Sequence, residues 1–433
     1  HPIDSTGKEK YLKDLKIFDY VRKEYDPNFS GISELEQKAI FERLAPEYTV
    51  VMNEMEEVKV PVSNKICTEK EMRITGDELE YKTFFLDEYQ VGQVNDMGRG
   101  HRVILANPGA GKSVLLLSKA FKYASMYKDS NILLTCYNSN LADSYCFKRS
   151  CANFGNDSNL HIMTFHKLVK KIYEECLHAR CADNIATPEE IQNCINLVKS
   201  GKLKLRFKAI FIDEVQIFDP QYLELCYLLL EDAEDNTFLM AGDLNQTVRK
   251  KSRRGDVPWK KIAGVTLDFT GRVKYIRKNY RNSKQIGLYL CHMLQHMNER
   301  MKMLNLIDFK ELEYDSFEVG ETKSLALNVK TGIGRMDITK KTVDAIKEIA
   351  EKYKLSYSEI AVLFPYKQHD RIRYYNLYWL RQALDAEDIP YSMITSSRDG
   401  IFERKRYSDT NGVVLSTIDS SLGLDFKAVI VTG

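Results

Sequence analysis

The chain has 433 residues, of which 44% are hydrophobic and 29% are charged, and its formal net charge is +2. These proportions exclude a disordered or fibrous chain, and the length suggests roughly two to three domains of ~150 residues. The near-neutral charge confines any nucleic-acid surface to local patches, and no run of about 18 apolar residues predicts a membrane span. The nine cysteines are an odd number, typical of a reducing compartment. We therefore expect a cytoplasmic protein without membrane partners.

Residues 1–83 form the first predicted domain, a small α+β segment of unknown role. Helical patterns at 8–24 and 33–44 precede a strand-like run at 57–62. Glu57-Val58-Lys59 in that run matches the E-x-K triplet of restriction-type nucleases, but no upstream aspartate on a strand accompanies it. The alternatives are a scaffold and the tail of a larger domain, such as a nuclease or another partner, upstream of residue 1.

From about residue 84 the pattern changes to short apolar runs, each followed by turn residues and an amphipathic stretch. The runs lie at 103–106, 132–136, 209–212, 238–241, 360–364, 413–415 and 428–431. Short β-branched runs that alternate with helices predict buried parallel strands in an α/β fold. Such sheets bind ligands at the carboxyl ends of their strands.

A phosphate-binding loop is predicted at 106–113, between a strand and the helical run that follows Ser113. Glycines let backbone N–H groups wrap a phosphate, and the helix N-terminus adds partial positive charge. Lys112 would reach the β- and γ-phosphates of ATP, and the Ser113 hydroxyl would hold Mg²⁺. The remaining predicted cofactor-binding residues of the loop are Asn107, Pro108, Gly109, Ala110 and Gly111.

An acidic pair follows the apolar run at 209–212. Asp213 would hold Mg²⁺ through water, and Glu214 would act as the general base that polarises the attacking water. The non-functional alternative is a strand that ends in two solvent-exposed acids. The position of the acidic pair about 100 residues after a phosphate loop favours the catalytic interpretation.

Further segments, in the same order, resemble motifs of the UvrD/Rep-like helicases of superfamily 1. They are LDEYQ (86–90), LLTCYNSNLAD (133–143), TFH (164–166), DEVQ (213–216), FLMAGDLNQ (238–246), NYRNS (279–283) and STIDSSLGLDF (416–426). In this family the phosphate loop often begins with alanine, as it does here at Ala106. The resemblance covers residues 84–433.

The resemblance implies roles for several residues of the nucleotide site. Gln90 would read the adenine edge, Tyr280 would stack on adenine, and Asp425 would bind the ribose. Arg281 would contact the γ-phosphate. Gln246 would couple the γ-phosphate to the nucleic-acid path. Lys112, Glu214, Gln246 and Arg281 are the predicted catalytic residues.

The resemblance also implies a path for single-stranded nucleic acid. Tyr137, Asn138, Thr164, His166 and Thr417 would contact the strand. An aromatic ring such as Tyr137 can offer a stacking platform worth ~1–3 kcal/mol per base, although core packing is its common alternative. Lys251 stands where the family has a base-stacking tryptophan, so a backbone contact is expected there. Leu422 stands where the family usually has lysine.

The implied architecture is two RecA-like P-loop NTPase domains with reduced accessory subdomains and ATP at their interface. The first would span 84–272, with a small insertion at about 167–208, and the second 273–433. The chain ends directly after the motif at 416–426, so we expect the arginine-bearing motif VI to lie beyond residue 433.

The implied function is an ATP- and Mg²⁺-dependent helicase or translocase on single-stranded nucleic acid, expected to be DNA, with 3′–5′ direction. The alternatives are an ATP-gated sensor or switch of the same fold, an RNA-directed member, and a non-motor P-loop enzyme. The motifs at 238–246 and 279–283 have no role in the last of these. A zinc site among the scattered cysteines is a further alternative, but their C-x4-C spacing is unlike that of common zinc sites.

Overall fold

The computed structural model describes residues 100–151, 159–177, 181, 185–232, 236–243, 269, 272–303, 314–316, 335–365, 376–395 and 403–432. The predicted segment 1–83 lies outside these residues, and so do its E-x-K triplet and the predicted helices at 8–24 and 33–44.

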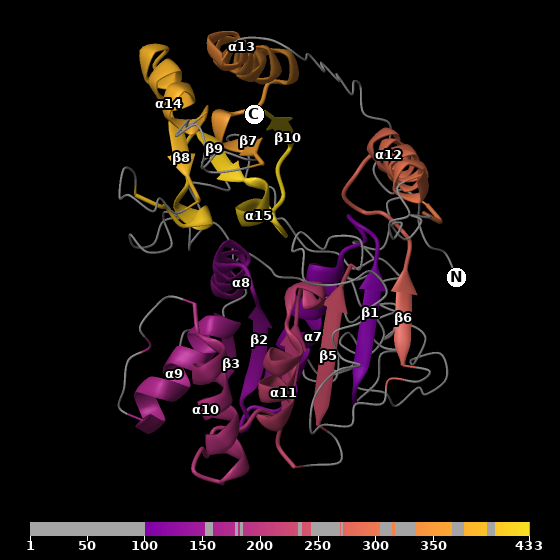
Figure 1. Ribbon diagram of the computed structural model, residues 1–433, viewed down its shortest axis with the longest axis vertical. Coiled ribbons are helices and arrows are strands. Elements are labelled where there is room, and N and C mark those ends of the chain that lie inside the picture. Colours follow the sequence, from indigo (N-terminus) through magenta and orange to yellow (C-terminus); the bar gives the residue numbers. More distant parts are fainter. Residues whose placement is uncertain are drawn as a thin grey trace, which may run out of the picture. The chain divides into compact units, whose positions relative to one another are not determined.

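The first sheet has six parallel strands in the order β3-β2-β4-β5-β1-β6. The strands are β1 (Arg102–Ala106), β2 (Ile132–Cys136), β3 (Leu160–Thr164), β4 (Ala209–Ile212), β5 (Thr237–Gly242) and β6 (Val273–Ile276). Strands β2, β4 and β5 are buried along their whole length, which explains their unbroken apolar sequences. Because all six strands run the same way, the segments after β1, β4 and β5 emerge at one edge of the sheet (Figure 1).

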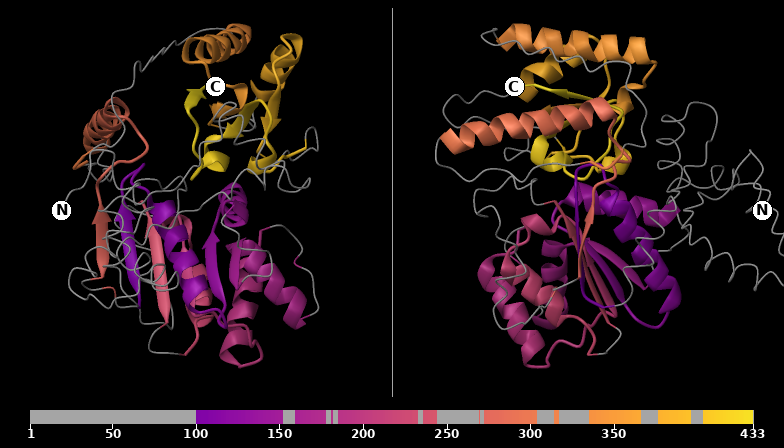
Figure 2. Two further views of the ribbon diagram at one scale, coloured as in Figure 1. Left: turned by 180° about the vertical axis from the view of Figure 1, so that it is seen from behind. Right: turned by 90° about the vertical axis from the view of Figure 1, so that its right-hand side faces the viewer.

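Helices cover both faces of this sheet (Figure 2). They are α7 (Lys112–Met126), α8 (Ser139–Cys151), α9 (Phe165–Leu177), α10 (Pro188–Lys199) and α11 (Pro220–Leu228). Ile210 and Ile212 of β4 share one core cluster with α9, α10 and α11. Phe211 between them packs edge-on against Tyr123 of α7. Since neighbouring side chains of a strand point to opposite faces, α7 covers the other side.

The second sheet has four parallel strands in the order β10-β7-β9-β8. The strands are β7 (Ile360–Phe364), β8 (Tyr391–Met393), β9 (Val413–Thr417) and β10 (Ala428–Val431), and the remaining helices are α12 (Lys284–Met303), α13 (Arg335–Tyr353), α14 (Asn376–Ala386) and α15 (Ile418–Ser421). Apolar side chains of α13 and α14 pack on one face of this sheet. A smaller cluster around Val414 and Leu424 fills the other.

All seven predicted apolar runs are strands, and the predicted α/β class with two parallel P-loop-type sheets is confirmed. Strands β3, β6 and β8 were not predicted. β3 and β6 are the two edges of the first sheet and carry partly exposed side chains, so their apolar signal is weaker. The prediction assigned residues 273–276 to the second domain, whereas β6 pairs with β1 of the first sheet. The predicted insertion at about 167–208 folds largely as α9 and α10.

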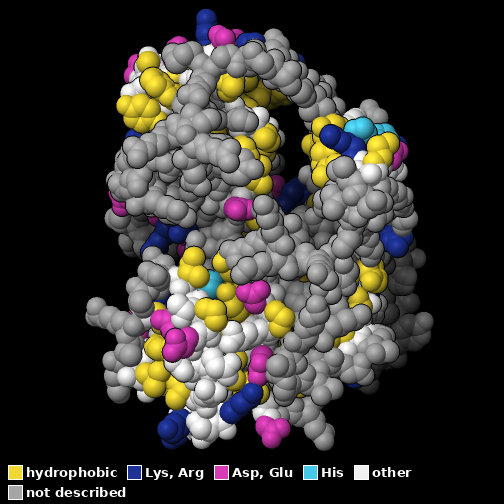
Figure 3. Space-filling view, viewed as in Figure 1, with side chains coloured by type: hydrophobic (Ala, Val, Ile, Leu, Met, Phe, Trp, Pro, Cys, Tyr) yellow, Lys and Arg dark blue, Asp and Glu magenta, His cyan; other side chains and the backbone are white. Residues whose placement is uncertain are grey.

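Helix α12 has an exposed apolar stripe. Tyr289, Met293 and Met297 recur at intervals of four residues and are each more than a third exposed, so they lie along one side of the helix. Figure 3 shows hydrophobic, basic and histidine side chains together where α12 lies. Within the described residues, no helix is both long enough and apolar enough to cross a membrane.

Candidate nucleotide-binding site

The phosphate loop joins β1 to α7, as predicted from the sequence. Gly109 and Gly111 have φ values of 82° and 78°, the left-handed region that glycine adopts without strain. The loop is closed by a hydrogen bond from Ala110 N to Asn107 O of 3.1 Å. Lys112 begins α7, is only 7% exposed, and donates from Nζ to Ala106 O at 3.3 Å. The lysine is therefore held inside the curve of the loop.

This loop fits a phosphate group. A Cβ atom added to Gly109 would lie 2.5 Å from Asn279 Oδ1, so only glycine allows the segment after β6 to pack this closely. Tyr280 N donates to Gly109 O at 2.8 Å, and Asn279 Nδ2 donates to Pro108 O at 3.3 Å. The carbonyl oxygens of Pro108 and Gly109 therefore already accept hydrogen bonds, and helix α7 begins at Lys112. These features are typical of an anion site.

Asp213 lies beside the loop, at the carboxyl end of β4, and is fully buried. Its Oδ2 accepts hydrogen bonds from Ser113 Oγ at 2.7 Å and from the Tyr145 hydroxyl, and its Oδ1 accepts from Glu214 N at 2.8 Å. A serine hydroxyl next to a carboxylate is a suitable oxygen donor set for Mg²⁺. The two residues predicted to hold the metal are therefore in direct contact.

Glu214 has an unusual backbone and an unusual environment. Its φ of 55° lies in the left-handed region that non-glycine residues rarely adopt, and its side chain is 4% exposed. Burial, together with the nearby Asp213 carboxylate, raises the pKa of Glu214 to about 7, although Lys112 opposes the shift. A carboxyl group with a pKa near neutrality suits proton transfer from water.

Gln216 is a site residue to which the sequence analysis gave no role. Its Nε2 donates to Glu214 Oε2, and its Oε1 accepts from Asp243 N at 3.1 Å. Asp243 directly follows β5, so one amide joins the ends of β4 and β5. The D-E-x-Q match contained this glutamine, but only the strand order places it between the Glu214 carboxylate and the backbone N–H of Asp243.

Arg281 lies in the segment that follows β6, next to the phosphate loop. Asn279 is fully buried, and its Oδ1 accepts from Arg281 N at 3.0 Å and from Asn282 N at 2.8 Å, which fixes the turn that carries the arginine. Arg281 Nε lies 3.3 Å from Asp425 Oδ2 of the second sheet. Arg281 falls in the predicted second domain (273–433), but the strand before it belongs to the first sheet. The Lys278 ammonium group lies over the Tyr280 ring, 5.0 Å from the ring centroid.

The residues predicted to contact nucleic acid are engaged inside the protein. Thr164 Oγ1 accepts from Lys167 N at 3.3 Å, and Thr417 Oγ1 accepts from Ser420 N at 3.2 Å. His166 is 6% exposed, and its Nδ1 accepts from Ala186 N at 3.2 Å. Tyr137 packs edge-on against His166, with ring centroids 5.1 Å apart. The structure groups Tyr137, Thr164 and His166 at the carboxyl ends of β2 and β3.

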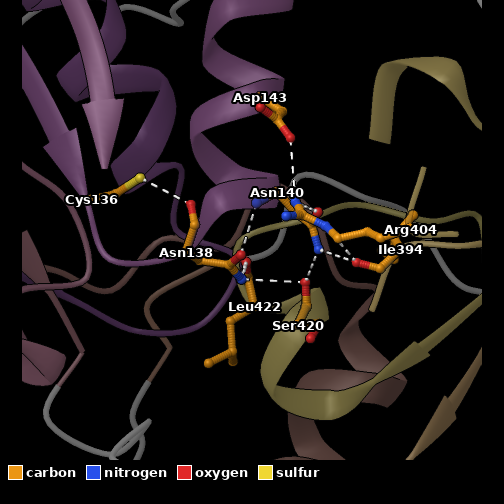
Figure 4. A network of polar contacts seen from close by, with 8 residues as sticks. All are labelled: Cys136, Asn138, Asn140, Asp143, Ile394, Arg404, Ser420 and Leu422. Atoms are coloured by element: carbon orange, nitrogen blue, oxygen red, sulfur yellow. Dashed lines mark hydrogen bonds and ion pairs between the residues drawn. The ribbon is translucent and has the colours of Figure 1, made fainter. Parts of the chain in front are cut away.

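Asn138 contacts the second sheet in this structure (Figure 4). Its Nδ2 donates to the carbonyl oxygens of Asp419, Ser420 and Leu422 at 3.2 to 3.3 Å. Asn138 thereby brings the segment after β2 together with the segment that contains Thr417.

Three predicted site residues lie outside the described part of the chain: Gln90, Gln246 and Lys251. For the zinc alternative, no group of three or more His, Cys, Asp or Glu side chains among the described residues is arranged to hold a metal ion. The seven cysteines whose side chains are described are free thiols.

Comparisons with known proteins agree with a P-loop site. The family model AAA_19, whose description is "AAA domain", matches residues 90–251. That range contains the phosphate loop, the acidic pair and β5. Comparison with curated proteins gave no match.

Solved structures with similar chains include ATPases and helicases. The Sulfolobus solfataricus SWI2/SNF2 ATPase core in complex with dsDNA shares 11% identity at a TM-score of 0.29, over 76% of this chain and 77% of that one. The NS3-like helicase of Alongshan virus shares 12% identity at a TM-score of 0.28, over 73% of this chain and 57% of the viral one. Similarity at this level assigns neither substrate nor direction, so the P-loop NTPase fold rests on the site and sheets described above.

Proposed function

We propose that the protein is an ATP-hydrolysing motor of the UvrD/Rep-like superfamily 1 helicases that moves on single-stranded nucleic acid. The observation that carries the proposal is the joint arrangement of Ser113, Asp213 and Glu214 beside the phosphate loop, with the segment that carries Arg281 hydrogen-bonded to the same loop through Tyr280 N and Gly109 O. The ordered motif series supports the helicase subtype. The resemblance favours DNA as the track and 3′–5′ as the direction.

In this proposal the chain binds ATP mainly through backbone groups of the phosphate loop and through Lys112. Ser113 and Asp213 hold Mg²⁺. Gln90 and Tyr280 hold the adenine, and Asp425 holds the ribose. Bound Mg-ATP supplies the phosphoryl group that passes to water, together with a metal ion that neutralises its charge.

Glu214 would orient the attacking water and accept its proton at a carboxylate oxygen. Its burial and the contact with Gln216 fix the side chain for this role. Because Gln216 also binds Asp243, a shift at Glu214 would reach the end of β5, which leads toward Gln246.

Arg281 would stabilise negative charge that develops on the transferred group. Its ion pair with Asp425 spans the two sheets, so closure around the nucleotide would act on both residues. Repeated closure and opening would then move the chain along a strand held by Tyr137, Asn138, Thr164, His166, Lys251 and Thr417.

A second candidate is an ATP-gated switch without processive movement. It is favoured by the internal engagement of the residues proposed to hold the strand. Thr164 and Thr417 cap the helices that follow them, His166 is buried, and Asn138 donates to α15. Leu422 at a position where lysine is usual also favours this candidate.

The test is a steady-state ATPase assay of the full chain, without nucleic acid and with single-stranded DNA or RNA of equal length. A motor is expected to be stimulated strongly, a switch weakly, and the stimulating polymer identifies the track. Lys112→Ala should abolish activity in every condition. Wild-type protein that neither binds nor hydrolyses ATP would refute both candidates.

We further propose a cytoplasmic location, which the seven free thiols support.

A further inference from the structure

Tyr145 is a buried residue that none of the recognised motifs uses. It lies on α8 and is 1% exposed. Its hydroxyl donates to Asp213 Oδ2, the same oxygen that accepts from Ser113 Oγ. A buried hydroxyl needs a partner, and here that partner is the carboxylate proposed to hold Mg²⁺. Any movement of the Asp213 carboxylate therefore acts directly on α8.

The N-terminal end of α8 contacts the segments that follow β8 and β9 of the second sheet. Asn138 Oδ1 accepts from Asn140 N at 2.9 Å, which caps the start of α8, while Asn138 Nδ2 donates to carbonyls at the end of α15. The Asn138 amide thus satisfies one free donor of α8 and carbonyl acceptors at the end of α15.

Asn140 adds a second connection at the same place (Figure 4). Its Nδ2 donates to Ser420 O at 2.7 Å and to Ile394 O at 3.1 Å, and its Oδ1 accepts from Arg404 Nη2 at 2.5 Å. Asn140 is 1% exposed, so these hydrogen bonds are shielded from water and are costly to break.

Helix α8 lies between these two contacts as a rigid element. Tyr145 follows Asn140 by five residues, which corresponds to ~8 Å along a helix axis at ~1.5 Å per residue. Over this length hydrogen-bonded helix transmits a displacement without bending. The packing of Leu141 against Gly423 adds an apolar contact to the same end, where a Cβ on Gly423 would lie 2.9 Å from Leu141 Cδ1.

We propose that Tyr145 is a positioning residue for Asp213, and that α8 transmits a shift of this carboxylate to α15 of the second sheet. The proposal rests on the proposed function, because it takes Asp213 as a residue that holds Mg²⁺ with a nucleotide. It gives the nucleotide site a mechanical link to the second sheet that is separate from the Arg281–Asp425 ion pair.

The test compares Tyr145→Phe with a matched control, Tyr123→Phe, in the full chain. Tyr123 is also buried, and its hydroxyl forms a hydrogen bond with Thr237 Oγ1 of β5, at 2.9 Å. The probe is ADP, with binding measured by calorimetry in Mg²⁺ and in EDTA. Hydrogen exchange of residues 418–424 is followed with and without Mg-ADP.

We expect Mg-ADP to change the exchange of residues 418–424 in the wild-type protein and in Tyr123→Phe, and to change it little in Tyr145→Phe. The gain in ADP affinity that Mg²⁺ provides should fall about 3- to 10-fold in Tyr145→Phe, the loss expected for one hydrogen bond. A Tyr145→Phe protein with the wild-type magnesium dependence and the wild-type exchange response would overturn the inference.

Asn140→Ala tests the contact between the N-terminal end of α8 and the second sheet. This test does not depend on the stability of Tyr145→Phe. It should still bind Mg-ADP, while residues 418–424 no longer respond to it. An unchanged response in Asn140→Ala would overturn the transmission through α8. If the wild-type protein binds no ADP at all, the proposed function fails and this inference fails with it. If the wild-type protein binds ADP and the variants respond to Mg-ADP as the wild type does, only this inference is refuted.

Discussion

Arg281 and Asp425 form an ion pair, with 3.3 Å between Nε and Oδ2, that joins the segment after β6 of the first sheet to the segment before β10 of the second. The Arg281 side chain is 40% exposed and that of Asp425 is 64% exposed. An exposed pair of this kind contributes little to stability, ~0–1 kcal/mol. The segment that carries Arg281 is hydrogen-bonded to the phosphate loop. We therefore expect the ion pair to act in the chemistry of the site.

Arg281→Ala is expected to lower the rate of ATP hydrolysis by ~10²-fold or more, because it removes a positive charge proposed to stabilise the transferred group. The thermal midpoint should stay close to that of the wild type, since the ion pair is exposed. Steady-state ATPase assays and thermal melts measure the two effects. Asp425→Asn is the comparison: it breaks the ion pair and the proposed ribose contact but leaves Arg281, so hydrolysis at saturating ATP should fall much less. Equal losses in the two variants would contradict a separate role for Arg281.

Glu214→Gln should reduce hydrolysis by ~10²–10⁴-fold, because an amide cannot accept the proton from water. Nucleotide binding, measured by calorimetry with ADP, should persist, since Lys112 and Ser113 remain in place. A variant with the wild-type rate of hydrolysis would show that another group accepts the proton.

The same substitution should change the pH dependence of stability. The folded-state pKa of Glu214 is raised to about 7 from an ordinary value of 4.5, so the native protein binds a proton that the unfolded chain releases in this range. The associated stability is fully present below pH 4.5 and is lost as the pH rises through 7. Without nucleotide, Glu214→Gln should therefore gain roughly 1–3 kcal/mol relative to the wild type above pH 7, and little at pH 4.5. Denaturant melts across pH 4.5–8.5 test this, and a pH-independent difference would count against the raised pKa.

Gly109→Ala should abolish nucleotide binding and destabilise the first sheet by more than the ~1–2 kcal/mol of left-handed strain, because the new methyl group would also meet Asn279. Gly201→Ala is the matched control. Gly201 also has a positive φ, of 70°, but a Cβ there meets nothing within 4 Å. It should cost only the ~1–2 kcal/mol of left-handed strain and should bind ADP normally. Normal ADP binding by Gly109→Ala would show that the packing against Asn279 is dispensable.

Gln216→Met keeps the length of the side chain but removes both of its hydrogen bonds. Glu214 and the Asp243 N–H would lose a buried partner, which costs about 1–3 kcal/mol for each group left unsatisfied. We expect a lower denaturation midpoint and slower hydrolysis, with weaker effects on ADP binding. Gln192→Met, at an exposed glutamine of α10, controls for the substitution itself and should match the wild type.

The sequence alone determined the strands that carry the site and the chemistry at their ends. Unbroken apolar runs such as 209–212 belong to central strands with both faces buried, and this gives a signal that is local in sequence. The glycines, Lys112 and Ser113 are readable for the same reason, because a phosphate loop is built from consecutive residues. Edge strand β6 lacks such a signal, and its residues were assigned to the second domain.

Only the tertiary structure decided which distant groups meet. Tyr145 lies 68 positions from Asp213, and Asn138 lies about 280 positions from the α15 carbonyls that it contacts. No periodicity records such pairs, because each depends on strand order and on how helices pack across a sheet. Burial is likewise decided by the fold: Thr164, His166 and Thr417 are each buried, and His166 accepts from Ala186, 20 positions away. Sites built from neighbouring residues can be identified in the sequence, whereas contacts between distant residues form only when the chain folds.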